Sequence, residues 1–313
     1  MKSFLNLIRW KSVILCLIAL FVVRFFLIES FYQTVAGGVI SSLSILEYII
    51  FCLSILLIVI ASVLINEYFD QDIDKINKAE KDIFIGKFIS EKRVLNLFYI
   101  LSAIGVLIGY IVGYLNGFLH LGSLLIAIAC ISYFYSLKYK RQFIVGNLVV
   151  AFLYSMIIFL PILFELFSLM KVQPEIFKII IHPLKEQLLP ITILFTAITF
   201  VLTFIREVIG DMQDEEGDRE GGCRSFAIVL GEKKTKYIVI AVTLLLIPLI
   251  YFLFYYYESY VSFLIVALII YIPLIFFLKE LRKAKAIQDY GFLSELLKMV
   301  YVSCLFAITM LKF

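Results

Sequence analysis

Regularly spaced acidic residues are the first feature of this sequence that could do chemistry. Asn66, Asp70 and Asp74 follow one another at intervals of four residues. Each such step turns an α-helix by only about 40°, so the three side chains are expected to share one helix face. Asp72 would point away from that face and is expected to be solvated.

A second acidic cluster occurs much later in the chain. Asp211, Asp214 and Asp218 follow an i, i+3, i+7 pattern, which again places them on one helix face. Glu207 joins the same stripe one turn earlier. Gly217 could end the helix locally, which leaves the position of Asp218 open.

Both clusters are expected at the C-terminal ends of helices that cross a membrane from outside to inside. Acidic residues at such an end oppose the helix dipole, and neighbouring carboxylates repel one another. Solvated helix ends would be one explanation. Two clusters facing each other would instead suit Mg²⁺, which takes oxygen ligands and usually keeps substrate phosphates in its shell. The pattern therefore favours a cradle for a Mg²⁺-bridged diphosphate.

Basic and phenolic side chains are expected close to these acids, at the inner ends of other helices. They are Arg9, Tyr135, Lys138, Lys140 and Arg141. Metal and cationic contacts would stabilise a departing diphosphate electrostatically. The general excess of positive charge on the inner side of membrane proteins would also explain these residues.

The composition identifies the elements that must position these groups. Of 313 residues, 63% are hydrophobic and only 17% are charged, and the mean hydropathy is +1.04. Soluble domains have about 45–50% apolar and about 25% charged residues. This excludes a soluble enzyme, a disordered protein and a collagen-like chain, and it indicates a protein that has lipid as its solvent.

Hydropathy predicts nine membrane spans in one domain that covers residues 1–313. They cover residues 12–30, 44–66, 93–115, 117–136, 143–166, 187–207, 236–257, 259–278 and 291–311. With a cytoplasmic N-terminus, most of the 28 Lys and Arg residues fall on the inner side. The predicted orientation therefore has the N-terminus inside and the C-terminus outside, in an integral membrane protein, most simply of the plasma (inner) membrane.

A prenyl diphosphate fits both the expected Mg²⁺–diphosphate cradle and the lipid environment, because its head is anionic and its tail is a hydrocarbon. Aromatic faces could shield the allylic cation that forms when the C–O bond ionises. No P-loop or dinucleotide-binding pattern accompanies the acids, so neither a nucleotide enzyme nor a nucleic-acid partner is indicated. A cation transporter is a distant alternative, because membrane-embedded acids can mark ion pathways. Here, however, the acids gather at inner helix ends, and the mid-bilayer is almost free of them.

At these residues the sequence resembles the UbiA superfamily of membrane prenyltransferases. The family motif N-D-x-x-D-x-x-x-D corresponds to residues 66–74, with Glu67 in place of the first Asp. The second motif, D-x-x-x-D with an acid upstream, corresponds to Asp214 and Asp218 with Asp211. The stretch Gly146-Asn147-Leu148 is similar to a central family segment, and residues 222–231 are similar to the segment after the second motif.

The resemblance implies an all-α fold with nine transmembrane helices in a UbiA-type bundle, with a central cavity open to the cytoplasmic side. It implies an enzyme that uses Mg²⁺, a polyprenyl diphosphate donor and a lipophilic acceptor. Catalysis would fall to Asp70, Asp74, Asp214 and Asp218. Metal binding would involve these four residues together with Asn66 and Asp211. Substrate binding would involve Asn66, Arg9, Tyr135, Lys138, Lys140 and Arg141.

The acceptor is less narrowly defined. Residues 74–78 resemble the branch that makes digeranylgeranylglyceryl phosphate, an ether-lipid precursor, which favours geranylgeranylglyceryl phosphate as acceptor. That branch continues with a proline-containing R-P-I-P-S-G segment, whereas residues 81–86 read Lys-Asp-Ile-Phe-Ile-Gly. An aromatic acceptor of quinone synthesis, 4-hydroxybenzoate or dihydroxynaphthoate, is the alternative.

Overall fold

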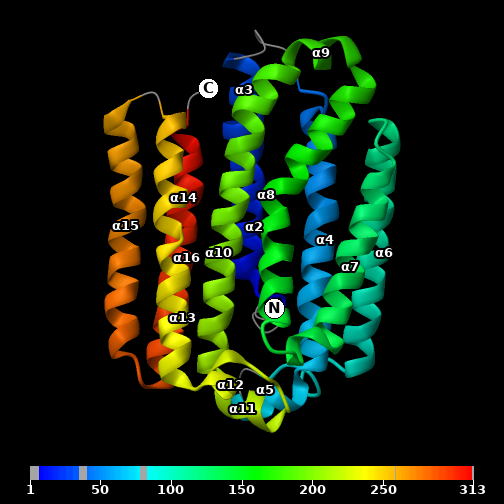
Figure 1. Cartoon of the computed structure of the whole chain (residues 1–313). Helices are drawn as coiled ribbons and strands as arrows, with labels where there is room; N and C mark the ends of the chain where they lie inside the picture. The colour runs from blue at the N-terminus through cyan, green and yellow to red at the C-terminus, as the bar shows by residue number, and fades with distance from the viewer. Residues whose placement is uncertain (1–6, 35–40, 78–82, 258, 312–313) are drawn as a thin grey trace. The chain divides into compact units, whose positions relative to one another are not determined.

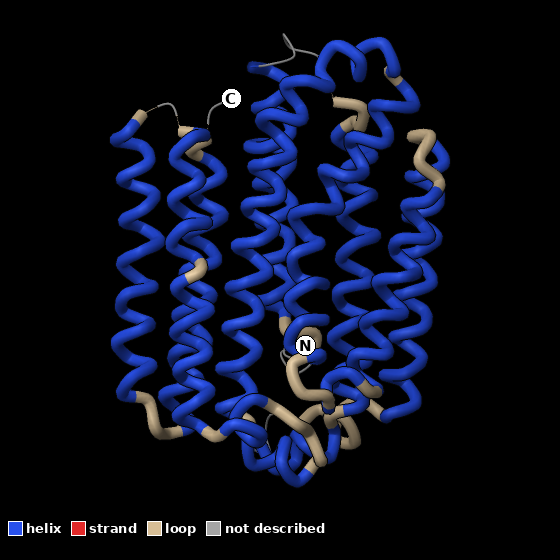
Figure 2. Tube along the Cα trace, viewed as in Figure 1, coloured by secondary structure: helices blue, strands red, loops and turns tan. Residues whose placement is uncertain are grey.

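The computed structural model describes residues 7–34, 41–77, 83–257 and 259–311. Within these ranges the chain is helical, apart from short loops and one isolated pairing of Ile85 with Ile89 (Figure 2). The described residues form nine helical stretches that are long and apolar enough to cross a membrane, which confirms the predicted number. They are Trp10–Thr34, Ile45–Phe69, Glu91–Leu115, His120–Leu137, Val145–Val172, Pro174–Gln213, Glu232–Tyr256, Tyr260–Lys283 and Ile287–Thr309.

Several stretches consist of more than one helical element (Figure 1). The elements up to residue 172 are α2 (Trp10–Val22), η1 (Val23–Ile28), α3 (Glu29–Thr34), α4 (Ile45–Phe69), α5 (Gln71–Asn77), α6 (Glu91–Leu115), α7 (His120–Leu137), η3 (Tyr139–Arg141) and α8 (Val145–Val172). The later elements are α9 (Pro174–Pro183), η4 (Leu184–Leu188), α10 (Leu189–Gln213), α11 (Glu215–Glu220), α12 (Phe226–Leu230), α13 (Glu232–Leu244), α14 (Leu246–Phe252), η5 (Leu253–Tyr256), α15 (Tyr260–Lys283) and α16 (Ile287–Thr309).

The segment between the fifth and sixth predicted spans is more helical than hydropathy indicates. α8 continues to Val172, and α9 begins at Pro174. Proline suits the first turn of a helix, because the N–H group that it lacks would have no partner within the helix there. A hydropathy window does not detect α9, because Glu175, Lys178 and His182 interrupt its apolar residues.

Packing divides the chain into two compact units, and each is described by itself. The first comprises residues 1–21, 41–140 and 160–179, and the second comprises residues 22–40, 141–159 and 180–313. The first acidic motif belongs to the first unit, and the second acidic motif to the second. The single domain expected over residues 1–313 stays a prediction.

In the first unit, α4 packs against α6 and α7 (Figure 1). α6 carries glycine at every fourth position, at Gly105, Gly109 and Gly113. A Cβ atom at Gly113 would lie only 2.5 Å from the carbonyl oxygen of Phe118. At Gly105, the Ser54 hydroxyl of α4 donates a hydrogen bond of 2.6 Å to the glycine carbonyl. Small residues of this kind let helix backbones approach closely in lipid.

In the second unit, α10 is the central helix. It packs against α16, α13, α12 and α14, and α15 packs against α16. The face that α10 buries includes Ile198, Leu202 and Ile205, three and four residues apart. α10 therefore has fixed neighbours close to its last turn, which leads into the second acidic motif.

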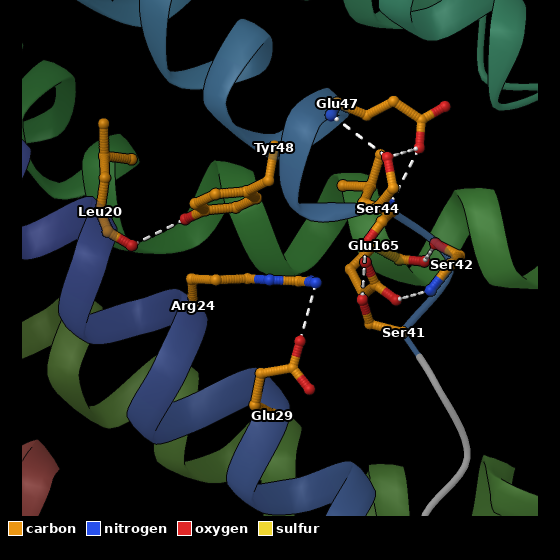
Figure 3. Close-up of polar contacts among 10 residues, drawn as sticks. Leu20, Arg24, Glu29, Ser41, Ser42, Ser44, Glu47, Tyr48 and Glu165 are labelled. Carbon is orange, nitrogen blue, oxygen red and sulfur yellow. Dashed lines mark hydrogen bonds and ion pairs between the residues drawn. The ribbon is translucent and has the colours of Figure 1, made fainter.

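The two cations that interrupt predicted spans, Arg24 and Lys298, have partners. In the second unit, Arg24 lies on η1 and pairs with Glu29 at 2.7 Å (Figure 3). In the same unit, Lys298 of α16 pairs with Glu295 at 2.5 Å. These pairs account for the two cations that interrupt predicted spans, because a paired charge is far less costly in lipid than a lone one.

In the first unit, the fully buried carboxylate of Glu165 accepts a hydrogen bond of 2.6 Å from the backbone N–H of Ser42 (Figure 3). Nearby in the chain, Ser44 and Glu47 form a capping box at the start of α4. The beginning of α4 is therefore fixed by hydrogen bonds to its backbone.

Candidate functional site

The first acidic motif lies at the end of a long helix. α4 ends at Phe69, and Asp70 is its C-cap with φ −91° and ψ 0°. The Asp70 N–H still donates to the Asn66 carbonyl at 3.0 Å, and the Asp74 N–H donates to the Asp70 carbonyl at 2.8 Å. The motif therefore spans a helix end and the short helix α5, whereas the spacing alone indicates one continuous helix.

The second acidic motif has the same local structure. α10 ends at Gln213, and Asp214 is its C-cap with φ −100° and ψ 14°. The Asp214 N–H donates to the Gly210 carbonyl at 2.9 Å, and the Asp218 N–H donates to the Asp214 carbonyl at 3.0 Å. The helix breaks at Asp214 and continues through Gly217 as α11, so Asp218 lies inside a short helix.

The two motifs correspond residue by residue in sequence and in backbone conformation at the junction. An aspartate occupies each junction (Asp70, Asp214), in the sparsely populated bridge region of backbone space where many active-site residues occur. A second aspartate follows four residues later in both motifs. Three residues before the junction, Glu67 of the first motif corresponds to Asp211 of the second. Glu67 therefore keeps the acidic character of its position.

In the first unit, the junction carboxylate is buried and has a cationic neighbour. Asp70 is 5% exposed. Its Oδ2 atom accepts a hydrogen bond of 2.7 Å from the Asn66 amide and another from the Lys140 ammonium group. Three residues that the sequence assigned to one site thus come together. A lysine ammonium group is thus the immediate cationic neighbour of the Asp70 carboxyl group.

Arg9 lies against the same motif. Its Nε and Nη2 atoms donate to Oε1 of the buried Glu67 at 3.1 Å and 2.8 Å. Arg9 has a φ of 49°, in the left-handed region that non-glycine residues seldom adopt. Such strain is typically retained where the surrounding contacts or the function require it. Arg9 thus contacts an acid of the motif, and its contact with a diphosphate stays a prediction.

In the second unit, an amide orients the acid that precedes the junction. The Asn147 side chain of α8, 7% exposed, donates a hydrogen bond of 2.8 Å to Oδ2 of Asp211. The sequence placed Asn147 only in a stretch that resembles the family and did not assign it to the site. The one available signal was an amide at the start of an otherwise apolar helix, where a buried amide needs a polar partner.

The remaining predicted residues lie in less constrained places. Tyr135 is half-buried near the end of α7, while Lys138 and Arg141 are exposed. The Arg141 carbonyl accepts a hydrogen bond of 3.2 Å from the Arg224 N–H, which ties the segment before α8 to the segment after α11.

Glu207 pairs with Arg206 at 2.7 Å, and Arg206 lies 4.9 Å from the ring centroid of Tyr154. Glu207 thus has a structural partner outside the acidic stripe.

Asp72 is solvated, as its spacing predicts. Its side chain is 94% exposed and pairs with Lys75 at 2.7 Å. The hydrogen bond from Lys75, together with the charge of its ammonium group, lowers the pKa of Asp72. Asp72 therefore differs from the neighbouring Asp70 in both burial and partners.

The carboxylate side chains of the two motifs suit Mg²⁺, because this ion needs only one or two ligands from the protein. Within the described part of the chain, no three His, Cys, Asp or Glu side chains gather closely enough to hold a metal ion. Mg²⁺ commonly uses one or two carboxylates and completes its octahedron with water and substrate phosphates. Asp70 and Asp214 with the aspartates that follow them are hard oxygen donors of this type, so the residues present fit this metal.

Comparison with known proteins gives one family. The model of the UbiA prenyltransferase family matches residues 31–297. The digeranylgeranylglyceryl phosphate synthase of Ignicoccus hospitalis is 28% identical over 167 residues, which are 53% of this chain and 48% of that protein. The synthase of the same name from Methanococcus aeolicus is 29% identical over 259 residues, 80% of this chain and 77% of that protein. The match thus spans about half of the first relative's length.

Solved structures share the fold. A structure from a study of digeranylgeranylglyceryl phosphate synthase in membranes has a TM-score of 0.62 and 22% identity, and the match covers 98% of both chains. A UbiA homolog from Archaeoglobus fulgidus bound to DMAPP and Mg²⁺ has a TM-score of 0.59 and 15% identity, over 98% of this chain and 99% of that one. An apo UbiA homolog from Aeropyrum pernix K1 has a TM-score of 0.67 and 13% identity, over 92% and 96% of the two chains.

Proposed function

This chain is an integral membrane protein of the UbiA prenyltransferase family, and from that premise we propose that it transfers a polyprenyl group from its diphosphate to a lipophilic acceptor in a Mg²⁺-dependent reaction. The observation that carries this proposal is the repeated junction. Asp70 and Asp214 end two long apolar helices in the same backbone geometry, each followed by a second aspartate four residues later. The UbiA homolog from Archaeoglobus fulgidus, whose solved structures hold DMAPP or GPP with Mg²⁺, supports the choice of metal and donor class.

In the proposed reaction, Asp70 and Asp74 of one motif and Asp214 and Asp218 of the other hold the metal–diphosphate head. Asn66 and Asp211 complete the two metal-binding motifs. When bound, Mg²⁺ would neutralise the charge that develops on the diphosphate as the C–O bond breaks. Diphosphate binding would involve Lys140, Arg141, Lys138, Tyr135, Asn66 and Arg9.

The hydrogen bonds seen in the first unit suggest how charge is exchanged on substrate binding. Lys140 neutralises Asp70 in the free protein. Asp70 would hold the metal ion when it is bound, and the Lys140 ammonium group would then be available to contact the anionic diphosphate. The allylic C–O bond would break with its electron pair on the diphosphate, the acceptor hydroxyl oxygen would attack the allylic carbon, and the hydroxyl proton would pass to an oxygen of the departing diphosphate.

The acceptor we propose is geranylgeranylglyceryl phosphate. The relatives from Ignicoccus hospitalis, Korarchaeum cryptofilum and Methanococcus aeolicus are all named digeranylgeranylglyceryl phosphate synthase. A phosphate-bearing acceptor needs cationic side chains in addition to those that would contact the diphosphate of the donor. Lys75 and Arg219 are candidates next to the two motifs, while Lys78 and Lys81 lie outside the described residues. The protein would work in the plasma (inner) membrane with its N-terminus and catalytic cavity on the cytoplasmic side and its C-terminus outside.

A reaction with the full-length protein in detergent tests the proposal. The protein is incubated with Mg²⁺ and geranylgeranyl diphosphate, with either geranylgeranylglyceryl phosphate or 4-hydroxybenzoate as acceptor. Mass spectrometry reports the prenylated product, and a coupled assay reports diphosphate release. We expect product with the glyceryl phosphate, loss of turnover in excess EDTA, and recovery when Mg²⁺ is restored.

The variants Asp70→Asn and Asp214→Asn should each lower turnover by orders of magnitude with the fold intact. Asp72→Asn is the matched control, because it removes an aspartate from the same segment whose side chain is 94% exposed. Full activity without a divalent metal, or equal losses in Asp72→Asn and Asp70→Asn, would refute the mechanism. Product with 4-hydroxybenzoate alone would refute the glyceryl phosphate acceptor and retain the donor chemistry.

A further inference from the structure

A charged cleft lies between α13 and α15 in the second unit. Its volume is about 330 Å³, and its lining consists of Glu232, Lys233, Lys236, Tyr237, Ile240 and Arg282. α13 and α15 pack against each other (Figure 1). The lining includes none of the acidic-motif residues, so the proposed reaction gives this cleft no role.

One acid and one base of the cleft satisfy each other. Lys236 donates to Oε1 of Glu232 at 2.6 Å and also to the carbonyl oxygen of Ala284. The Tyr290 hydroxyl donates to the same Glu232 oxygen at 2.9 Å, and the Lys236 ammonium group lies 5.7 Å from the centroid of the Tyr290 ring. The charges of Glu232 and Lys236 therefore cancel each other, and this pair adds no net charge to the lining of the cleft.

Two further cations have no such compensation. Lys233 at the start of α13 and Arg282 near the end of α15 are exposed. Neither side chain makes an ion pair or hydrogen bond with another residue in the part of the chain that the structure describes. Two cations on neighbouring helices beside a cleft suit a phosphate group, because a guanidinium and an ammonium can both donate to its oxygens.

The apolar surface next to these cations favours a lipid over a soluble anion as the ligand of the cleft. On α13, Tyr237, Ile240 and Leu244 follow Lys233 at i+4, i+7 and i+11, so they continue the same helix face. Tyr237 is 62% exposed, and Leu244 is also exposed. On α15, Ile275 is exposed two turns before Arg282. A hydrocarbon chain could follow this surface while its head stays between the two cations.

We propose that the cleft between α13 and α15 binds the phosphate head of an anionic membrane lipid, with Lys233 and Arg282 as the head contacts. Basic recesses between transmembrane helices are suited to anionic lipid heads, because they combine charge with an apolar wall. This site goes beyond the proposed prenyl transfer and does not depend on it.

Native mass spectrometry of the full-length protein in detergent tests this site. The probes are phosphatidic acid, phosphatidylcholine of the same chain length, and inorganic phosphate as competitor. The test variant is Lys233→Gln/Arg282→Gln. The control is Lys234→Gln/Lys283→Gln, which removes the same charge from the adjacent positions outside the cleft. Melting temperatures establish that both variants are folded.

We expect phosphatidic acid to bind the wild type at least tenfold more tightly than phosphatidylcholine. The test variant should weaken this binding by about 30-fold, equivalent to about 2 kcal/mol, and the control should stay within about threefold of the wild type. The single variant Arg282→Lys, which keeps a positive charge at this position, should keep most of the affinity for phosphatidic acid. The proposal is overturned if both double variants lose affinity equally, if phosphatidylcholine binds as tightly, or if inorganic phosphate at the same concentration displaces the lipid.

Discussion

The hydrogen bond from Asn147 to Asp211 gives a direct test of how the second motif is positioned. The bond is 2.8 Å long, and its donor is buried. A hydrogen bond to a charged group contributes about 1.5–3 kcal/mol, and each 1.4 kcal/mol corresponds to about a factor of ten. Asn147→Ala should therefore raise the Mg²⁺ concentration needed for half-maximal turnover by about 10–100-fold, the range also found when groups that orient metal ligands are removed.

The assay is diphosphate release at saturating donor and acceptor, titrated with Mg²⁺. Ser155→Ala is the matched control, because Ser155 is a buried polar residue of the same helix. Among the residues that the structure describes, its hydroxyl donates only to the Phe152 carbonyl, at 2.7 Å. Saturating Mg²⁺ should restore most of the turnover of Asn147→Ala. A lowered turnover number with an unchanged Mg²⁺ requirement would show that Asn147 acts elsewhere.

A double-mutant cycle separates orientation from a general loss of packing. If Asn147 acts through the Asp211 carboxylate, then Asn147→Ala should change the Mg²⁺ requirement by less than about threefold when Asp211 is already Asn. When two residues act through a shared group, the free-energy effects of their substitutions do not add in such a cycle. The same 10–100-fold effect in both backgrounds would refute the reasoning.

Two further predictions follow from contacts in the first unit. Lys140→Gln should raise the KM for the prenyl diphosphate by about 10–100-fold at saturating Mg²⁺, because the ammonium group that leaves Asp70 can no longer bind the diphosphate; donor titration measures this, and an unchanged KM would contradict the assignment. Gly113→Ala should lower the free energy of unfolding by about 1–3 kcal/mol, because its Cβ would lie 2.5 Å from a backbone oxygen. Gly109→Ala should cost less, because its Cβ would meet the movable tip of Leu125; equal thermal denaturation of the two variants would exclude the steric explanation.

The sequence predicted the spans better than the details of the site. Lipid requires long apolar helices, so hydropathy alone locates all nine spans of the described residues. Spacing also placed Asn66 and Asp70 on one helix face, and their side chains share a hydrogen bond of 2.7 Å. It could not show that the helix breaks at Asp70, because residues on either side of a C-cap keep the same periodicity as an unbroken helix.

Long-range partners were beyond what spacing can show. Arg9 meets Glu67 across 58 positions, and Asn147 meets Asp211 across 64. Neither contact follows from a pattern within one helix, and both require the packing of separate elements. The glycine stripe of α6 could have been read as a close-packing signal, since Gly105, Gly109 and Gly113 repeat at every fourth residue.

That stripe has a consequence for how the protein is made. Its partners α4 and α7 flank α6 in the chain, so their packing requires only segments that emerge early in synthesis. α10, in contrast, packs against α16, which is translated after α13 and α15. We therefore expect the helices that carry the first motif to assemble while later helices are still being translated, and the second motif to become fixed only once α16 has been made.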